Sequence, residues 1–433
     1  MKNISIKLAL GFMVINLCLS PMVSLAQKQD GVLSIETCYQ LARVNYPLIK
    51  QQELLAKAKD LSLDNAQKTV LPQVQLAGQA TYQSDVTGLP ISIPNMEVPS
   101  LNKGQFKVFA ELTQSLTALL ILKDQKEQLA AQTAVDNQKL EVELYKIHDR
   151  INNLYFGILL LDKQLSQIQL SKQDIQQGID KIETAIKNGV ALKSSVNNLK
   201  AELLQVNQRI IGLQYDRRTY VQMLSSFIKK ELAEDVQLSL PASMNYVPHI
   251  ARPEQTLFQL QRDALSAQTK LIDAKTLPQL SVFVQSGVGN PGLNMLKAET
   301  QGFYIAGLKL GWNLNNFYTQ KNDKSLVETN QRLLAVQEEA FVFNTEMEIA
   351  QQEKELEKLK LLHEADKELI QLREQVKNST LNQLNYGTAN TSDYILDLHA
   401  VEQAKQNQAI HEIQILMANY KLQIISGIPS SNN

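Results

Sequence analysis

The feature that most constrains the fold is a long heptad pattern of aliphatic residues in the first half of the chain. From Leu140 to Ile186, leucine and isoleucine recur mainly at alternating spacings of four and three residues. This spacing lines them up along one side of an α-helix, which can then pack against another helix as a coiled coil. The pattern predicts a helix of about 65 to 70 residues from about Thr117 to Asn188, roughly 100 Å long. A compact globular domain has no room for such a helix.

The chain turns back after each of two long helices. Asn188-Gly189 ends the first helical pattern, and an aliphatic pattern resumes at Leu192. Tyr386-Gly387 ends a second, less regular pattern and precedes another returning helix. Glycine is typical of the point just beyond a helix end. We therefore expect two long antiparallel helical hairpins. The residues at their tips are Gly189, Ser194, Ser195, Tyr386 and Gly387.

Four stretches alternate between apolar and polar residues and predict the strands of two β-hairpins, 72–114 and 278–314. One face of each strand is apolar, and the other is rich in Gln, Thr, Lys and Glu. Any one strand could belong to a half-buried hairpin of a soluble domain. Four strands of about ten residues favour segments that cross a membrane, because a tilted strand of that length spans the bilayer hydrocarbon. The aromatic residues that we expect at the membrane interfaces are Tyr82, Phe106, Tyr304 and Trp312.

Landmarks of the first half recur in the same order in the second half. Leu71-Pro72-Gln73 precedes the first β-hairpin, and Leu277-Pro278-Gln279 precedes the second. We expect two copies of one unit that runs helix, strand, strand, very long helix, turn, helix. The predicted division is a first repeat over 27–230 with its turn near 189, an irregular equatorial linker over 231–252, a second repeat over 253–427 with its turn near 387, and a C-terminal tail over 428–433.

The N-terminus carries the pattern of a cleaved secretory signal over residues 1–26. A basic start and an apolar run over 8–19 precede the small residues Ser24-Leu25-Ala26. The run is shorter than the roughly 20 residues of a membrane-spanning helix. The residues before Cys18 lack the small side chains of a lipidation site. Cleavage would leave Cys38 as the single cysteine, so we expect no intrachain disulfide.

The sequence indicates neither catalysis nor a cofactor. Its five histidines show no spacing that would gather metal ligands, and glycine-rich phosphate loops are absent. A formal net charge of −1, with charges scattered along the chain, provides no basic stripe for nucleic acid. We expect no catalytic residues, no metal, no cofactor and no nucleic-acid partner.

Transmembrane strands imply an oligomer. An open sheet edge would leave backbone groups unpaired in lipid, and four strands cannot close into a barrel. Three copies of the chain would supply twelve strands. The predicted fold class is therefore mainly α with transmembrane β, in which long antiparallel coiled-coil helices form an α-helical barrel below a trimeric 12-stranded β-barrel.

Several motifs make the chain similar to TolC-like outer-membrane efflux proteins, the outer membrane factor family. The residues that carry the resemblance are Leu33-Ser34-Ile35-Glu36, Leu41-Ala42, Asn45, Pro47, Leu71-Pro72-Gln73, Arg252-Pro253-Glu254, Leu277-Pro278-Gln279, Tyr386-Gly387 and Asp393. The resemblance covers nearly the whole mature chain. It implies a homotrimer in the outer membrane of a Gram-negative bacterium, with a large periplasmic portion. It also implies a passive exit duct for efflux or type I secretion, which docks with a periplasmic adaptor (membrane fusion) protein and an inner-membrane transporter.

The resemblance further implies an acidic constriction at the periplasmic entrance. Asp393 stands where the family commonly has an aspartate, whereas a second family aspartate falls at Leu396, with Asp397 one residue later. Three Asp393 carboxylates around the axis would favour cations. Asp393 could instead cap the returning helix. At the first tip, Ser194 and Ser195 predict a helix cap without charge.

A soluble periplasmic coiled-coil scaffold or adaptor is the alternative. Such a protein would share the signal segment and the heptad pattern. It would not need four amphipathic strands of membrane length, and for that reason the duct is the favoured hypothesis.

Overall fold

The computed structural model of the chain describes residues 32–88, 101–187, 192–242, 250–295 and 297–427. The chain divides into two units, Met1–Val32 and Leu33–Asn433, and the second contains all of the helices and strands below. Three predicted features lie outside the described residues. They are the signal segment 1–26, the tip residue Gly189 and the tail 428–433.

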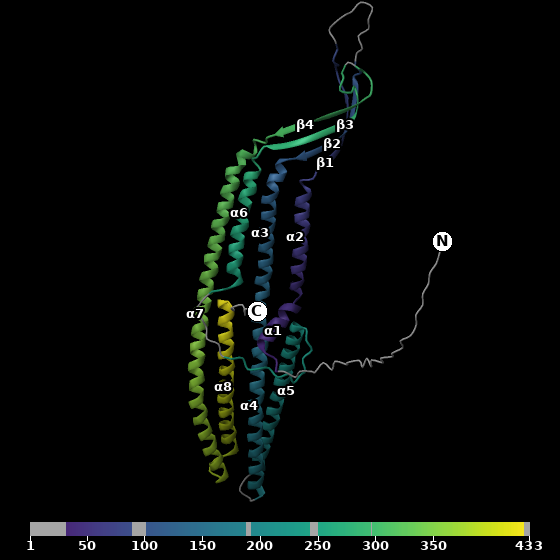
Figure 1. Cartoon of the computed structure of the whole chain (residues 1–433). Coiled ribbons are helices and arrows are strands. Elements are labelled where there is room, and N and C mark those ends of the chain that lie inside the picture. The colour runs from purple at the N-terminus through teal and green to yellow at the C-terminus, as the bar shows by residue number, and fades with distance from the viewer. Residues whose placement is uncertain (1–31, 89–100, 188–191, 243–249, 296, 428–433) are drawn as a thin grey trace, which may run out of the picture. The chain divides into compact units, whose positions relative to one another are not determined.

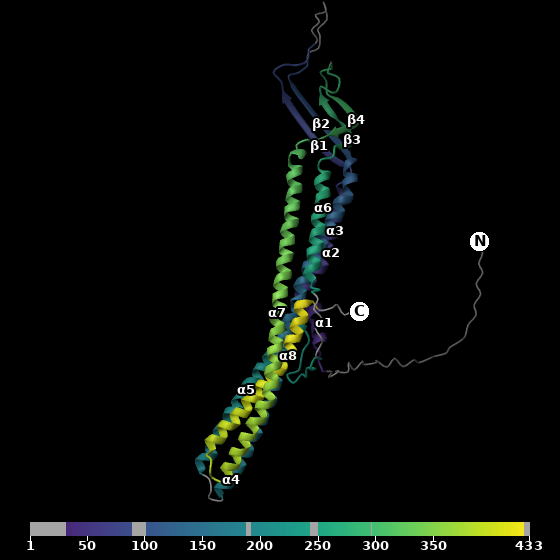
Figure 2. The same ribbon diagram turned by 90° about the vertical axis from the view of Figure 1, so that its left-hand side faces the viewer.

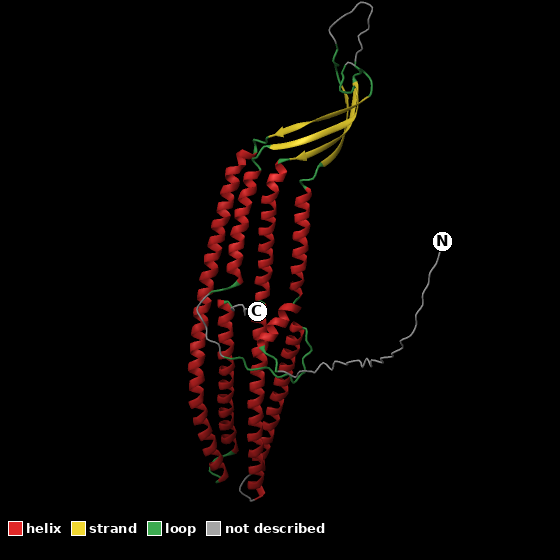
Figure 3. Cartoon of the chain, viewed as in Figure 1, coloured by secondary structure: helices red, strands yellow, loops and turns green. Residues whose placement is uncertain are grey.

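Long helices make up most of the second unit (Figures 1 and 3). α7 is continuous over 70 residues and therefore spans about 105 Å. The helices before the sequence midpoint are α1 Ile35–Asn45, α2 Lys50–Lys68, α3 Thr117–Tyr145, α4 Ile147–Lys187 and α5 Lys193–Ile228, with a short 3₁₀ turn η1 at Pro47–Ile49. Those after it are α6 Pro253–Ala274, α7 Asn316–Asn385 and α8 Thr391–Ser426.

The helices form two bundles that share α7. In one bundle, next to the sheet, α2 packs on α3, α3 on α6, and α6 on α7. In the other, the hairpin α4–α5 packs against the hairpin α7–α8, mainly through α4 and α8. Figures 1 and 2 show α7 running alongside both bundles. The two long antiparallel hairpins predicted from the heptad pattern are present.

The predicted single helix from Thr117 to Asn188 was wrong in one respect, because it is interrupted at Lys146, between α3 and α4. The interruption coincides with the place where α1 packs on α4. There the ring of His148 lies 4.6 Å from the ring of Tyr39, centroid to centroid. His148 Nδ1 donates to the Tyr145 carbonyl at 2.9 Å and so satisfies a backbone acceptor beside the break.

The four predicted strands are also present. They are β1 Gln73–Tyr82, β2 Gly104–Ser115, β3 Gln279–Asn290 and β4 Gln301–Gly311. Each strand pairs antiparallel with its neighbour in the order β1-β2-β3-β4. The two hairpins therefore join through β2 and β3 into one sheet, with β1 and β4 at its edges (Figure 3).

The heptad residues of the first hairpin form the core. Ile151, Ile158, Ile168 and Ile175 are buried in two apolar clusters, one around α1, α4 and the end of α5 and one between the hairpins. Part of α7, the first helix of the second hairpin, differs. Leu369, Leu372 and Val376, which follow the same spacing on α7, are exposed in the single chain.

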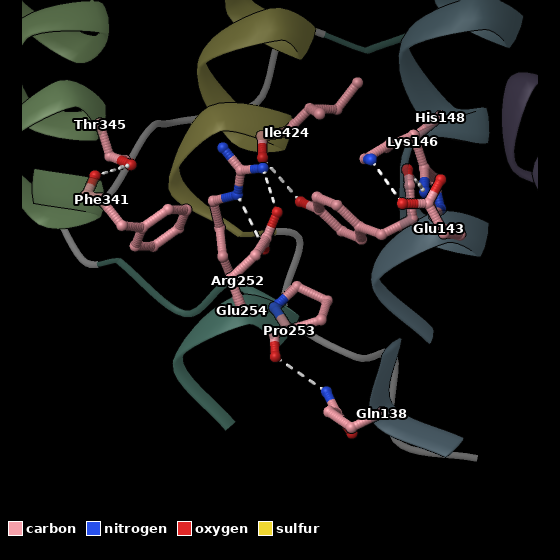
Figure 4. Close-up of polar contacts among 11 residues, drawn as sticks. Gln138, Glu143, Lys146, His148, Arg252, Pro253, Glu254, Phe341, Thr345 and Ile424 are labelled. Atoms are coloured by element: carbon pink, nitrogen blue, oxygen red, sulfur yellow. Dashed lines mark hydrogen bonds and ion pairs between the residues drawn. The ribbon is translucent and has the colours of Figure 1, made fainter. Parts of the chain in front are cut away.

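The linker over 231–252 joins the parts of the unit at mid-length. Leu33 and Leu238 form a parallel β-bridge, and the Tyr155 hydroxyl lies 2.8 Å from the Leu33 carbonyl oxygen. At the end of the linker, Arg252 pairs with Glu254 through a 3.1 Å bond from Nε (Figure 4). The Arg252 guanidinium also lies over the rings of Tyr145 and Phe341. These contacts connect the linker to α3, α6 and α7.

Candidate functional site

The sheet exposes an extensive apolar face. By strand register, twelve large apolar residues share this face, and each is between 39% and 82% exposed. A contiguous apolar surface of this kind marks a place where a membrane or another protein binds. The twelve residues are Val74, Leu76, Tyr82, Phe106, Val108, Leu112, Val282, Val284, Val288, Tyr304, Leu308 and Leu310.

Three of the four aromatics singled out from the sequence belong to this face. Tyr82 and Phe106 lie in the half of the sheet farther from the helices, as does Tyr304. Trp312 lies one residue beyond β4, at the helical end, where its Nε1 donates to the Thr276 carbonyl at 3.0 Å. The four aromatics therefore occupy both ends of the sheet.

The opposite face of the sheet is polar but contains three phenylalanines, Phe109, Phe283 and Phe303. Their side chains are less exposed than the large apolar side chains of the apolar face. Phe109, which interrupts the alternation of the sequence, pairs with Gly287. A Cβ atom at Gly287 would come within 2.5 Å of the Phe109 Cβ, so only glycine fits under this side chain. Phe303 pairs with the same glycine from the other side and is 8% exposed. Each phenylalanine of the polar face thus pairs with a glycine of a neighbouring strand, since Phe283 pairs with Gly307.

The tip of the second helical hairpin is a tight turn. α7 ends at Asn385, and the exposed Tyr386 forms its C-cap. Gly387 has a φ of 70°, a left-handed conformation that favours glycine. The Thr388 N–H then donates to the Gln383 carbonyl at 2.9 Å, which satisfies one of the last acceptors of α7.

Asp393 completes the cap of the returning helix, whose N-cap residue is Asn390. Its backbone N–H donates to Asn390 Oδ1 at 2.9 Å, and its carboxylate accepts from the Asn390 N–H at 3.1 Å, which together form a capping box. The carboxylate remains exposed, and so does Leu396 one turn later. Asp397 differs, since its carboxylate accepts from the Thr380 hydroxyl of α7 at 2.6 Å and so connects the two helices of the hairpin.

The predicted cap at the first tip was wrong. α5 begins at Lys193 with Leu192 as its N-cap, and no side chain makes a capping hydrogen bond there. Ser194 and Ser195 lie within the first turn of the helix, one and two residues past its start. The Ser195 N–H donates to the Leu192 carbonyl instead, at 3.1 Å.

A cluster of ionisable side chains around two buried glutamates joins the two helical hairpins, and the sequence patterns did not predict it. This interhairpin cluster consists of Glu202 and Arg209 of α5 and His399 and Glu402 of α8. Arg209 NH1 lies 3.0 Å from Glu402 Oε1, and His399 Nε2 lies 3.2 Å from Glu202 Oε2. Both glutamates are 6% exposed. One signal in the sequence could have revealed this cluster. Each returning helix has a glutamate beside its aliphatic heptad residues, and a charged side chain buried there is costly without a partner.

No family model and no curated protein sequence matches the chain. The outer membrane protein VceC from Vibrio cholerae matches with a TM-score of 0.65 at 14% identity, over 91% of this chain and 96% of VceC. CusC, a protein whose crystal structures describe transmembrane channel formation, matches with a TM-score of 0.69 at 13% identity. The match covers 91% of this chain and 92% of CusC. The MtrE outer membrane channel of Neisseria gonorrhoeae matches with a TM-score of 0.63 at 12% identity, over 91% and 89%.

This chain has the fold of the outer-membrane channels.

The outer-membrane channel fold was expected from the sequence resemblance and is confirmed over nearly the whole length of both chains. Within the described residues, no helix combines the length and apolarity needed to cross a bilayer. In the same part of the chain, no group of three or more His, Cys, Asp or Glu side chains lies where it could hold a metal ion.

Proposed function

We propose that the chain is one protomer of a homotrimeric exit duct in the outer membrane of a Gram-negative bacterium. The duct passively conducts substrates from the periplasm, or from a pump, to the exterior. The observation that carries this proposal is the two-faced sheet, in which large apolar residues are exposed on one face and polar residues on the other. Such a sheet suits a wall between lipid and a watery lumen. The fold of the outer-membrane channels supports the same function.

The edges of the sheet support the proposal of a trimer. The single chain leaves β1 and β4 unpaired at their outer sides, and unpaired backbone groups are not tolerated in lipid. Three chains, each pairing its β1 with the β4 of a neighbour, would close twelve strands. The helices support this arrangement, because Leu333, Val336 and Phe343 form an exposed apolar stripe on α7 that a neighbouring chain would cover.

The remaining assignments follow the same architecture. Residues 1–26 act as a cleaved signal, and 27–230 and 253–427 are two repeats of one unit, joined by the equatorial linker 231–252 and followed by the tail 428–433. The aromatics Tyr82, Phe106, Tyr304 and Trp312 lie at the membrane interfaces. The hairpin tips Gly189, Ser194, Ser195, Tyr386 and Gly387 form the periplasmic entrance, where Asp393 and Asp397 narrow the pore. The duct has no catalytic activity and no cofactor, and it works with a periplasmic adaptor (membrane fusion) protein and an inner-membrane transporter.

A soluble periplasmic scaffold or adaptor accounts less well for the same chain. It would leave twelve large apolar side chains of the sheet facing water. No described contact covers them.

Current measurements across a planar bilayer test the proposal. Purified wild-type protein is expected to insert and to give discrete channels. Asp393→Asn removes the charge and retains an acceptor for the capping box, whereas Asp393→Ala removes both. If Asp393 narrows the pore electrostatically, both variants lose cation preference. Protein that stays in the aqueous phase of a detergent extraction and never inserts would contradict the duct.

A further inference from the structure

The polar face of the sheet carries a lysine held by aromatic rings. Lys107 Nζ lies 4.6 Å from the centroid of the Phe303 ring and 5.2 Å from that of Phe109. Within the described part of the chain, Nζ contacts the Gln285 side-chain oxygen at 3.5 Å and no carboxylate. The electron-rich ring faces attract the ammonium group without neutralising it. The two rings and Gln285 therefore hold the Lys107 ammonium group at one place on this face.

A negative charge lies on the same face, four residues further along β2. Glu111 accepts from the Gln285 Nε2 at 3.2 Å and from the Thr113 hydroxyl at 3.2 Å. The Glu111 position is about 13 Å from that of Lys107, at about 3.3 Å per residue. The charged groups themselves lie closer together than that, because both bond to the amide of one Gln285 side chain, but they form no ion pair with each other. Gln285 lies between them, with its oxygen toward the cation and its N–H toward the anion.

The two charges occupy different levels of the sheet. β2 begins at Gly104, the end of the sheet farther from the helices, and Lys107 is near this end. Glu111 is nearer to Thr117, where α3 begins. In the trimer of the proposed function, three copies of each residue would form two rings around the lumen, with the Lys107 ring toward the exterior.

We propose that Lys107 and Glu111 set the charge preference of the duct at its outer end. The Lys107 ring attracts anionic solutes, and the Glu111 ring attracts cationic ones. The inference rests on the proposed function, because it requires the polar face to line a conducting lumen. It assigns selectivity to the strands, in addition to any contribution from the acidic residues at the helix tips.

The test is the reversal potential of single trimers in a KCl gradient. Lys107→Gln is expected to shift it toward cation preference, and Glu111→Gln toward anion preference. Both shifts are expected to be larger near 0.1 M salt, where charges act over about 10 Å, than at 1 M, where they act over about 3 Å. Lys107→Arg is expected to retain the wild-type value. Lys57→Gln, the same charge change on the exposed side of α2, is the matched control.

Two outcomes overturn the inference and can be told apart. Wild-type and Lys107→Gln channels with equal reversal potentials at low salt would refute the role of Lys107 and leave the duct in place. A wild-type protein that forms no channels would refute both. If Lys107→Gln fails to assemble, Lys107→Met, which keeps the aliphatic stem over the rings, replaces it and is expected to give the same shift.

Discussion

Burial changes the chemistry of several side chains where α1 packs on α4. Desolvation raises the pKa of the Cys38 thiol to about 12, with a smaller contribution from Glu36. The Tyr39 pKa is raised for the same main reason. The pKa of His148 is lowered, first by burial and further by Arg43, although its bond to the Tyr145 carbonyl opposes the change. These groups are therefore neutral in the folded protein near pH 7.

His148 is expected to make the protein less stable in acid. In the unfolded chain the imidazole titrates near its ordinary pKa of 6.5, whereas in the folded chain its pKa is lower. The unfolded state binds more protons between those two values. The contribution of neutral His148 is therefore complete above pH 6.5 and is lost as the pH falls through the folded pKa. Thermal unfolding measured from pH 7.5 downward should show this slope.

The variant that tests the role of His148 is His148→Gln, which retains a hydrogen-bond donor for the Tyr145 carbonyl but does not titrate. It should lose the part of the slope that begins at pH 6.5. An unchanged pH dependence in this variant would show that other groups cause the loss of stability.

At the scale of elements, the two helical hairpins are held together by both apolar and charged contacts. The apolar cluster between them includes Leu199 of α5 and Leu398 of α8. The interhairpin cluster adds two buried glutamates that share Arg209, a cation with a 44% exposed side chain. Since buried carboxylates are costly without a partner, the pairing of the hairpins depends on that arginine.

Arg209→Met is expected to weaken hairpin pairing. The variant leaves Glu202 and Glu402 buried without the guanidinium that contacts both of them. The expected loss of unfolding free energy is about 2 kcal/mol, below the roughly 3–5 kcal/mol of a fully buried pair, because the guanidinium is partly exposed. Denaturant unfolding measures the change.

Lys200→Met is the control for this variant. Lys200 pairs with Glu183 at 2.9 Å, and both side chains are exposed. Its removal should cost less than about 1 kcal/mol. Equal losses in the two variants would contradict a special role for the interhairpin cluster.

At the scale of the whole molecule, the proposed trimer in its membrane would cover the surfaces that a single chain leaves exposed. In that arrangement, lipid would cover the apolar face of the sheet, strands of other chains would pair with the edges β1 and β4, and helices of other chains would cover the apolar stripe of α7. A single chain supplies none of these partners. Trimer formation and membrane insertion are therefore expected to depend on each other.

Leu76→Arg tests that dependence. Leu76 is 80% exposed in the single chain, so the substitution should leave a soluble scaffold unaffected. On a lipid-facing strand, an arginine near the bilayer midplane costs about 2–4 kcal/mol. The variant should therefore yield less membrane-inserted trimer, measured as heat-dissociable oligomer in outer-membrane fractions.

Gln75→Arg provides the comparison. Gln75 is the preceding residue of β1 and points to the opposite, polar face. The Gln75→Arg variant should assemble into trimers as well as the wild type does. Equal amounts of trimer in both variants would argue against a lipid-facing sheet.

Much of the candidate site could be predicted because it depends on local periodicity. The tips at Tyr386 and Gly387 were visible as a glycine that ends a helical pattern, and the capping role of Asp393 was one of two hypotheses. The absence of a cap at Ser194 and Ser195 could not be predicted, because N-capping depends on which residue has extended backbone angles, and here that residue is Leu192.

The sequence by itself determined the helices, the strands and their faces. The reason is that a period of 3.5 or 2 residues fixes which side chains share a side of an element before any tertiary contact forms. Only the tertiary structure decided where the long helix breaks, at Lys146, and that the two β-hairpins join through β2 and β3. It also decided that Phe109 packs over Gly287 and that Glu202 and Glu402 lie in one cluster. Each of these brings together residues from separate elements, and their compatibility depends on packing and register that no local pattern contains.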